Sequence, residues 1–202
     1  MKKLLLAAVL SSVCSVALAE TKNTYDYVNL TYNSFDVNEA DSKYTGLGLE
    51  GSKLLTENVF VTANWFSVED ADTVPGAVYD FNIDQLGVAV GYRHALNAQT
   101  DLYAQLGYVR QEMSADIAYN NQLVSDSETE TGYQLKAGVK RSFGKFEGGV
   151  FLERLDAGGD ADATTSIGLD GRYAFTDQFH GVVGYAKDSD VAQFKLGVSY
   201  AF

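Results

Sequence analysis

The sequence contains very little cysteine or proline, and it has no long apolar run beyond its first residues. Cys14 is the one cysteine, and it lies within residues 1–19, so the rest of the chain offers no disulfide, thiol nucleophile or thiolate metal site. Pro75 is the one proline, as expected of a chain that is mostly strand. After residue 19 no apolar run approaches the roughly 20 residues of a helical span. A membrane location for this part therefore requires a barrel.

Basic residues are also scarce. The chain has 15 Lys and Arg against 27 Asp and Glu, which gives a formal charge of −12. This acidity argues against nucleic acid as a partner, because phosphate binding needs clustered Lys and Arg. Neither linkers nor low-complexity tracts are apparent, and the length suits one domain.

The first residues have the pattern of a cleaved secretory signal. Lys2 and Lys3 precede an apolar run, and Ala17-Leu18-Ala19 provides small residues before Glu20. The alternative is a membrane anchor, for which the apolar run is too short. We predict a signal peptide over residues 1–19 and one domain over residues 20–202. Loss of the two lysines makes the charge of the exported chain −14.

The remaining residues alternate between apolar and polar types with a period of two, which predicts strands. Short polar turns alternate with generally longer loops, two of which are expected at about 67–82 and 111–127. The fold class predicted is all-β, a transmembrane antiparallel up-and-down β-barrel of ten strands, with eight as the alternative. The expected strands are 26–33, 44–53, 59–66, 85–93, 102–109, 133–140, 146–153, 166–173, 179–185 and 194–202.

The two faces of these strands indicate which side contacts lipid. One face is apolar and free of charge through the middle of each strand; the other mixes glycine with amides and charges, which would make a poor dry core. We therefore expect the apolar face to point outward. Its aromatic residues then form two girdles. The periplasmic girdle is Tyr92, Phe146, Tyr173, Phe179, Tyr200 and Phe202, and the outer girdle is Tyr32, Trp65, Tyr108, Tyr133, Tyr185 and Phe194.

With its signal peptide, alternating strands and closing FKLGVSYAF, the chain resembles the small bacterial outer-membrane β-barrel family that includes OmpA-type and OmpX-type barrels. The resemblance implies a location in the Gram-negative outer membrane, with outer-membrane lipid and lipopolysaccharide as surroundings. It also implies recognition by the barrel-assembly machinery, for which Tyr200 and Phe202 match the expected assembly signal. The strand count departs from the best-known members, which have eight.

The expected lumen contains charges of both signs. The periplasmic half is predicted to contain a layer of ion pairs formed by Glu50, Arg93, Lys140, Glu147, Asp170 and Arg172, and Lys136, Glu153 and Lys195 are expected nearer the outside. Such pairs can fill a narrow barrel. We predict a lumen plugged by ion pairs and a structural or surface-interaction role. The alternative is a narrow porin-like channel for small solutes or ions.

No enzymatic activity, cofactor or metal is predicted. His94 and His180 both fall at the periplasmic ends of strands, and no nucleophile, base and orienting group come together at the outer mouth. The expected loops hold two acidic groups, Glu69, Asp70 and Asp72, and then Asp156, Asp160 and Asp162. We interpret these as solvated surfaces, with weak bridging of divalent cations as the alternative. We expect a monomer, and the sequence indicates no particular surface ligand or receptor.

Overall fold

The computed structural model describes residues 23–38, 42–74, 77–119, 122–159 and 162–202. These residues form ten strands that close into one antiparallel barrel, in which each strand pairs with its neighbours in sequence and β1 pairs with β10. The predicted fold class and the count of ten strands are confirmed. The strands are β1 Tyr27–Val37, β2 Ser42–Leu54, β3 Val59–Val74, β4 Ala77–Asn97, β5 Thr100–Tyr119, β6 Gln122–Phe143, β7 Phe146–Asp156, β8 Thr164–Ala174, β9 Phe179–Lys187 and β10 Val191–Ala201.

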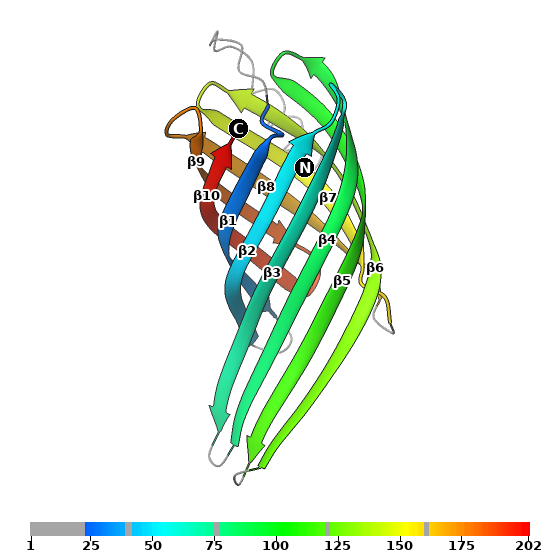
Figure 1. Cartoon of the computed structure of the whole chain (residues 1–202), viewed down its shortest axis with the longest axis vertical. Coiled ribbons are helices and arrows are strands. Elements are labelled where there is room, and N and C mark those ends of the chain that lie inside the picture. Colours follow the sequence, from blue (N-terminus) through cyan, green and yellow to red (C-terminus); the bar gives the residue numbers. More distant parts are fainter. Residues whose placement is uncertain (1–22, 39–41, 75–76, 120–121, 160–161) are drawn as a thin grey trace, which may run out of the picture.

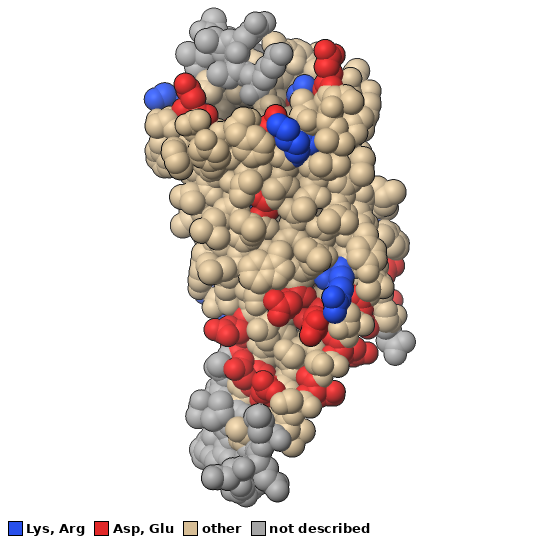
Figure 2. Space-filling model, in the orientation of Figure 1, with Lys and Arg blue, Asp and Glu red and all other residues tan. Residues whose placement is uncertain are grey.

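The outer wall is apolar along the phase that the sequence predicts. Leu47, Val88, Leu106 and Leu196 each keep about half or more of their side chain exposed, and the alternate residues point into the lumen. Both predicted aromatic girdles lie on this wall, and their members pair across strands, as Tyr185 does with Phe194. In Figure 2 charged side chains gather above and below a largely uncharged band.

Four strands continue well beyond this band. The pairing of β3 through β6 extends to Val74↔Ala77 and Tyr119↔Gln122, so the expected loops at 67–82 and 111–127 are wrong. Figure 1 shows these strands projecting from the end of the barrel opposite the C label. We call these outer ends of the four strands, residues 67–74, 77–84, 111–119 and 122–130, the projecting sheet.

A change of phase explains the error. Within the band the apolar residues of β4 are the outward ones, such as Leu86 and Val88, whereas Phe81 and Ile83 lie on the inward phase and alternate with the outward Asp80 and Asp84. Outside the lipid region the outer side of a strand contacts water, and polar residues belong there. The alternation is therefore continuous, but the face that carries apolar residues is reversed.

At the opposite end, short turns use side chains as hydrogen-bond acceptors. In the turn between β2 and β3, Thr56 Oγ1 accepts from the amides of Asn58 and Val59, at 3.3 and 3.0 Å. Thr176 does the same between β8 and β9 for Gln178 and Phe179. Such side-chain acceptors satisfy amides that the ladder leaves unpaired and hold each turn tight.

Candidate functional site: the charged lumen

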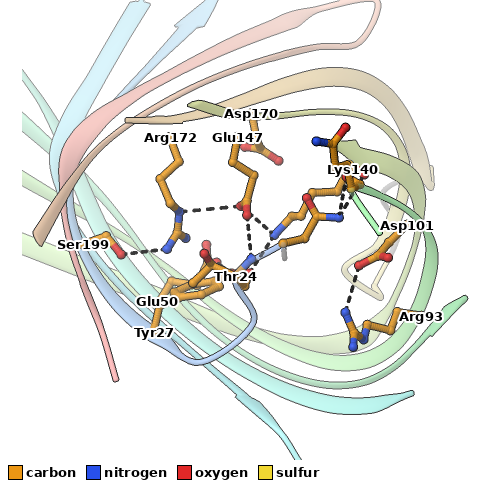
Figure 3. Close-up of polar contacts among 12 residues, drawn as sticks. Thr24, Tyr27, Glu50, Arg93, Asp101, Lys140, Glu147, Asp170, Arg172 and Ser199 are labelled. Atoms are coloured by element: carbon orange, nitrogen blue, oxygen red, sulfur yellow. Dashed lines mark hydrogen bonds and ion pairs between the residues drawn. The ribbon is translucent and has the colours of Figure 1, made fainter. Parts of the chain in front are cut away.

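Asn23, Thr24 and Tyr25, which precede β1, lie inside the lumen. The Asn23 side-chain amide donates to the carbonyls of Gln99 and Lys140, at 3.1 and 3.3 Å. The Lys140 ammonium donates to the Thr24 carbonyl at 3.1 Å, and the Thr24 amide donates to Glu147 Oε2 at 2.6 Å. Figure 3 shows Thr24 among these side chains within the ring of strands. Asn23 and Thr24 are thus joined to the barrel wall by hydrogen bonds, of which the two at Thr24 are charge-assisted.

Tyr25 anchors the same segment in a small aromatic cluster. Its ring is 4.9 Å from the ring of Phe60, and both side chains are buried together with Tyr103 and Phe151. The Arg93 guanidinium lies 4.9 Å from the centre of the Tyr25 ring. Burial, and then the nearby Asp101 carboxylate, raise the pKa of the Tyr25 phenol above its ordinary value. The cluster thus anchors Tyr25 inside the lumen.

Glycines on neighbouring strands make room for the two phenylalanine rings. A Cβ atom at Gly91 would overlap the ring of Phe60, and one at Gly168 would overlap the ring of Phe151. The missing side chains let the rings lie flat against the inner wall. Glycine is used here for close approach of a neighbouring side chain.

Glu147 lies at the centre of the first group of ion pairs (Figure 3). It is 3.3 Å from Lys140 and 3.8 Å from Arg172, in addition to its bond from the Thr24 amide. Arg172 also donates to Ser199 Oγ at 3.0 Å. These side chains are largely shielded from solvent, so each charge depends on its partners.

Arg93 makes a separate pair with Asp101, at 3.0 Å, and Asp101 is almost fully buried. Asp101 is absent from the predicted set. It lies at the first position of the inward phase of β5, two residues before Tyr103, so the strand period alone was sufficient to include it.

The second group of ion pairs connects Lys195 to two acids. Its ammonium is 3.1 Å from Asp170 and 3.9 Å from Glu50. Tyr27 completes the group, because its hydroxyl donates to Glu50 Oε1 at 2.6 Å. Lys136 pairs separately with Glu153 on the neighbouring strand, at 3.2 Å.

The sequence predicts Glu50 and Asp170 in the periplasmic half of the lumen and Lys195 nearer the outside. In the structure Lys195 nevertheless contacts both of these acids. Asp170, Gly184 and Lys195 are successive register partners on β8, β9 and β10. The Lys195 side chain runs directly over Gly184, where a Cβ would overlap it, and so reaches Asp170. Because the strands of a barrel are tilted, a row of register partners rises along the barrel axis from one strand to the next. The distance of a residue from the end of its strand therefore does not identify the residue it contacts. All nine predicted lumen residues take part in ion pairs.

A cavity of about 190 Å³ lies within the lumen. Its lining includes the paired charges and the amide side chains of Asn33, Asn64, Gln85, Gln105 and Gln134. This lining is polar and nearly neutral, because its charges are matched, and such a cavity suits water.

The histidines and acidic residues considered as candidates for catalysis or metal binding do not come together in a site within the described residues. His94 is exposed at the end of β4, and His180 is buried on β9 with Nε2 3.3 Å from the Asp177 carbonyl oxygen. Within the described residues no three His, Cys, Asp or Glu side chains are grouped to hold a metal ion. No described helix is long and apolar enough to cross a membrane. Asp160 and residues 1–19 lie outside the described residues.

A closed antiparallel barrel with an apolar outer wall, aromatic girdles and a charged lumen defines the membrane type of β-barrel. The chain belongs to the family described as outer membrane protein beta-barrel domain, whose family model matches residues 5–202. The predicted resemblance is therefore confirmed.

Solved structures with a similar fold come from several bacteria. The β domain of the Bordetella autotransporter BrkA is 14% identical, covers 89% of this chain and 100% of its own, and has a TM-score of 0.50. The attachment invasion locus protein Ail of Yersinia pestis is 14% identical over 90% of this chain and 100% of its own, with a TM-score of 0.46. The N-terminal β-barrel domain of Pseudomonas aeruginosa OprF is 15% identical over 89% of this chain and 100% of its own, with a TM-score of 0.41. The comparison with curated proteins finds no match.

Proposed function

We propose that the protein is a non-conducting outer-membrane barrel whose lumen is plugged and whose projecting sheet acts at the cell surface. The plug combines residues 23–26 with the ion pairs around Glu147 and Lys195. The observation that carries the proposal is the Thr24–Glu147–Lys140 arrangement, because it joins a segment outside the strands to charges on the wall. Side chains fill the interiors of narrow barrels in the same way.

The apolar outer face of the barrel indicates what surrounds the protein. Outer-membrane phospholipid and lipopolysaccharide would contact the apolar band, and the barrel-assembly machinery would read Tyr200 and Phe202 during insertion. We propose a cleaved signal peptide over residues 1–19 and a monomeric barrel. The runner-up function is a narrow channel, which the cavity of about 190 Å³ favours.

Single-channel recording in planar bilayers separates the two functions. The wild-type protein should show no stable open conductance. Arg93→Gln combined with Arg172→Gln should introduce conducting events, because both guanidinium groups fill the lumen. Arg110→Gln combined with Arg154→Gln is the matched control, since both of these guanidinium groups are exposed on the outer side of the strands. A large, steady conductance in the wild-type protein would contradict the plug.

A further inference from the structure

The inner face of the projecting sheet carries apolar side chains with no cover from the strands opposite. Its members belong to the two central strands, β4 and β5, and pair across them as Ile83 with Met113 and Tyr79 with Ile117. Phe81 keeps 40% of its surface exposed and Met113 38%. We call this set the apolar stripe: Tyr79, Phe81, Ile83, Met113, Ala115 and Ile117. Exposed apolar surface of this kind marks a contact site.

Acidic side chains border the stripe on both sides. Asp70 on β3 is the register partner of Phe81, and Glu128 and Asp126 on β6 are the partners of Met113 and Ala115. Glu130 follows on the same face of β6. No described Lys or Arg forms an ion pair with any of these four carboxylates. The face is therefore apolar along its middle, with one carboxylate on the β3 rim and three on the β6 rim.

The dimensions of this surface match one helix. The stripe extends over five residues of a strand, which are four steps or about 14 Å, and the rims on β3 and β6 are three strand spacings apart, again about 14 Å. An α-helix with its side chains is about 10–12 Å wide and rises about 1.5 Å per residue. A helix of two to three turns laid along β4 and β5 would cover the stripe and place its flanks against the two rims.

We propose that the inner face of the projecting sheet binds a cationic amphipathic helix, with its apolar side on the stripe and Lys or Arg side chains against the rims. The inference rests on the proposed function, which places this sheet at the cell surface. Complementary charge on both flanks gives such a partner its orientation, and apolar burial gives most of its affinity. A second copy of this chain is disfavoured, because it would bring the same acidic rims together.

Binding of a designed peptide tests the proposal directly. The probe is a fluorescent helix of about 15 residues with a leucine face flanked by lysines, and its control carries glutamate in place of every lysine. The full-length protein is used in nanodiscs of zwitterionic lipid, with empty nanodiscs subtracted. Fluorescence anisotropy should detect the lysine peptide and not the glutamate peptide, and added salt should weaken binding.

Two matched pairs of substitutions locate the contact. Asp126→Asn with Glu128→Gln removes two charges from the inner face, and Asp80→Asn with Asp116→Asn removes two from the outer face of the same sheet. The inner pair should weaken binding about tenfold and the outer pair less than about twofold. Phe81→Thr with Met113→Thr should weaken binding about tenfold as well, because it removes the apolar contact. Retarded migration of unheated samples in electrophoresis verifies that every variant is folded.

Several outcomes would overturn the proposal. Equal weakening by the two charge pairs would mean non-specific attraction to an acidic protein. Absence of peptide binding to the wild type, or a self-association that Phe81→Thr removes, would mean that no cationic helix occupies the face. These results are independent of the bilayer recording: an open wild-type channel that still binds the peptide contradicts only the plug.

Discussion

At the scale of single residues, Glu147 is the most connected acid of the lumen. It accepts the Thr24 amide and lies within ion-pair distance of Lys140 and Arg172. When one member of a buried ionic group is removed, the remaining charges are buried without compensation. Their desolvation then destabilises the protein by more than the ion pair itself contributed. Glu153, by contrast, faces a single cation, Lys136.

Replacing Glu147 with Gln should therefore lower the free energy of unfolding by about 3 kcal/mol. Glu153→Gln should cost clearly less, since it leaves one cation rather than two without a carboxylate partner. Urea unfolding in lipid vesicles, followed by the fluorescence of Trp65, measures both values. Equal losses in the two variants would show that Glu147 has no special place in the network.

The absence of a side chain at Gly184 leaves room for Lys195 to reach Asp170. Ala at this position should push Lys195 away from Asp170 and lower the free energy of unfolding by about 1–3 kcal/mol, as overpacking does. Gly148→Ala on β7 is the control, because a Cβ there has room, with its nearest contact at 3.7 Å. The control should be neutral or slightly stabilising. The same urea unfolding assay measures the free energy of unfolding of both variants. An unchanged value for Gly184→Ala would contradict the passage of the Lys195 side chain over Gly184.

At the scale of elements, the projecting sheet places acids directly opposite one another on its outer face. Asp80 pairs in register with Asp116, and Asp84 pairs with Glu112. Like charges directly opposite on neighbouring strands are destabilising. The outer end of β4 and β5 is thus held by its ladder hydrogen bonds and inner face against this repulsion.

Neutralising one member of the opposed pair should strengthen the sheet. Asp116→Asn is expected to stabilise the outer end of β4–β5 by about 0.2–1 kcal/mol, seen as slower amide hydrogen exchange there. Glu69→Gln makes the same charge change opposite the neutral Asn82 and should leave exchange unaltered. If both variants slow exchange equally, the effect comes from total charge and not from the pair.

At the scale of the whole molecule, one wall must contact acyl chains. Leu106 lies near the middle of the membrane part of β5 and is 61% exposed on the outward face. Arg at this position should lower the free energy of unfolding in lipid by about 2–4 kcal/mol, the cost of a cation near the bilayer midplane. Ser114→Arg lies on the same face of the same strand beyond the band, and it should cost less than about 0.5 kcal/mol as an ordinary surface change. Similar losses at the two positions would place Leu106 outside the hydrocarbon.

The alternating pattern within the membrane made most of the wall predictable. The outward phase, the two girdles and ten strands all follow from a period of two, which each strand carries in its own residues. The inward phase likewise indicated the lumen residues, since a side chain on the lumen side of a strand can be read from its neighbours. The projecting sheet was missed because its apolar phase is reversed, so residues 79–84 and 111–117 looked like polar loops.

The sequence by itself determined which face of each strand is apolar and which residues line the lumen, because both depend on local alternation. Tertiary structure decided the partners: that Lys195 crosses Gly184 to Asp170, that Thr24 reaches Glu147, and that Asp101 pairs with Arg93. Those contacts depend on strand tilt and stagger, which are fixed only when β1 meets β10 and the barrel closes.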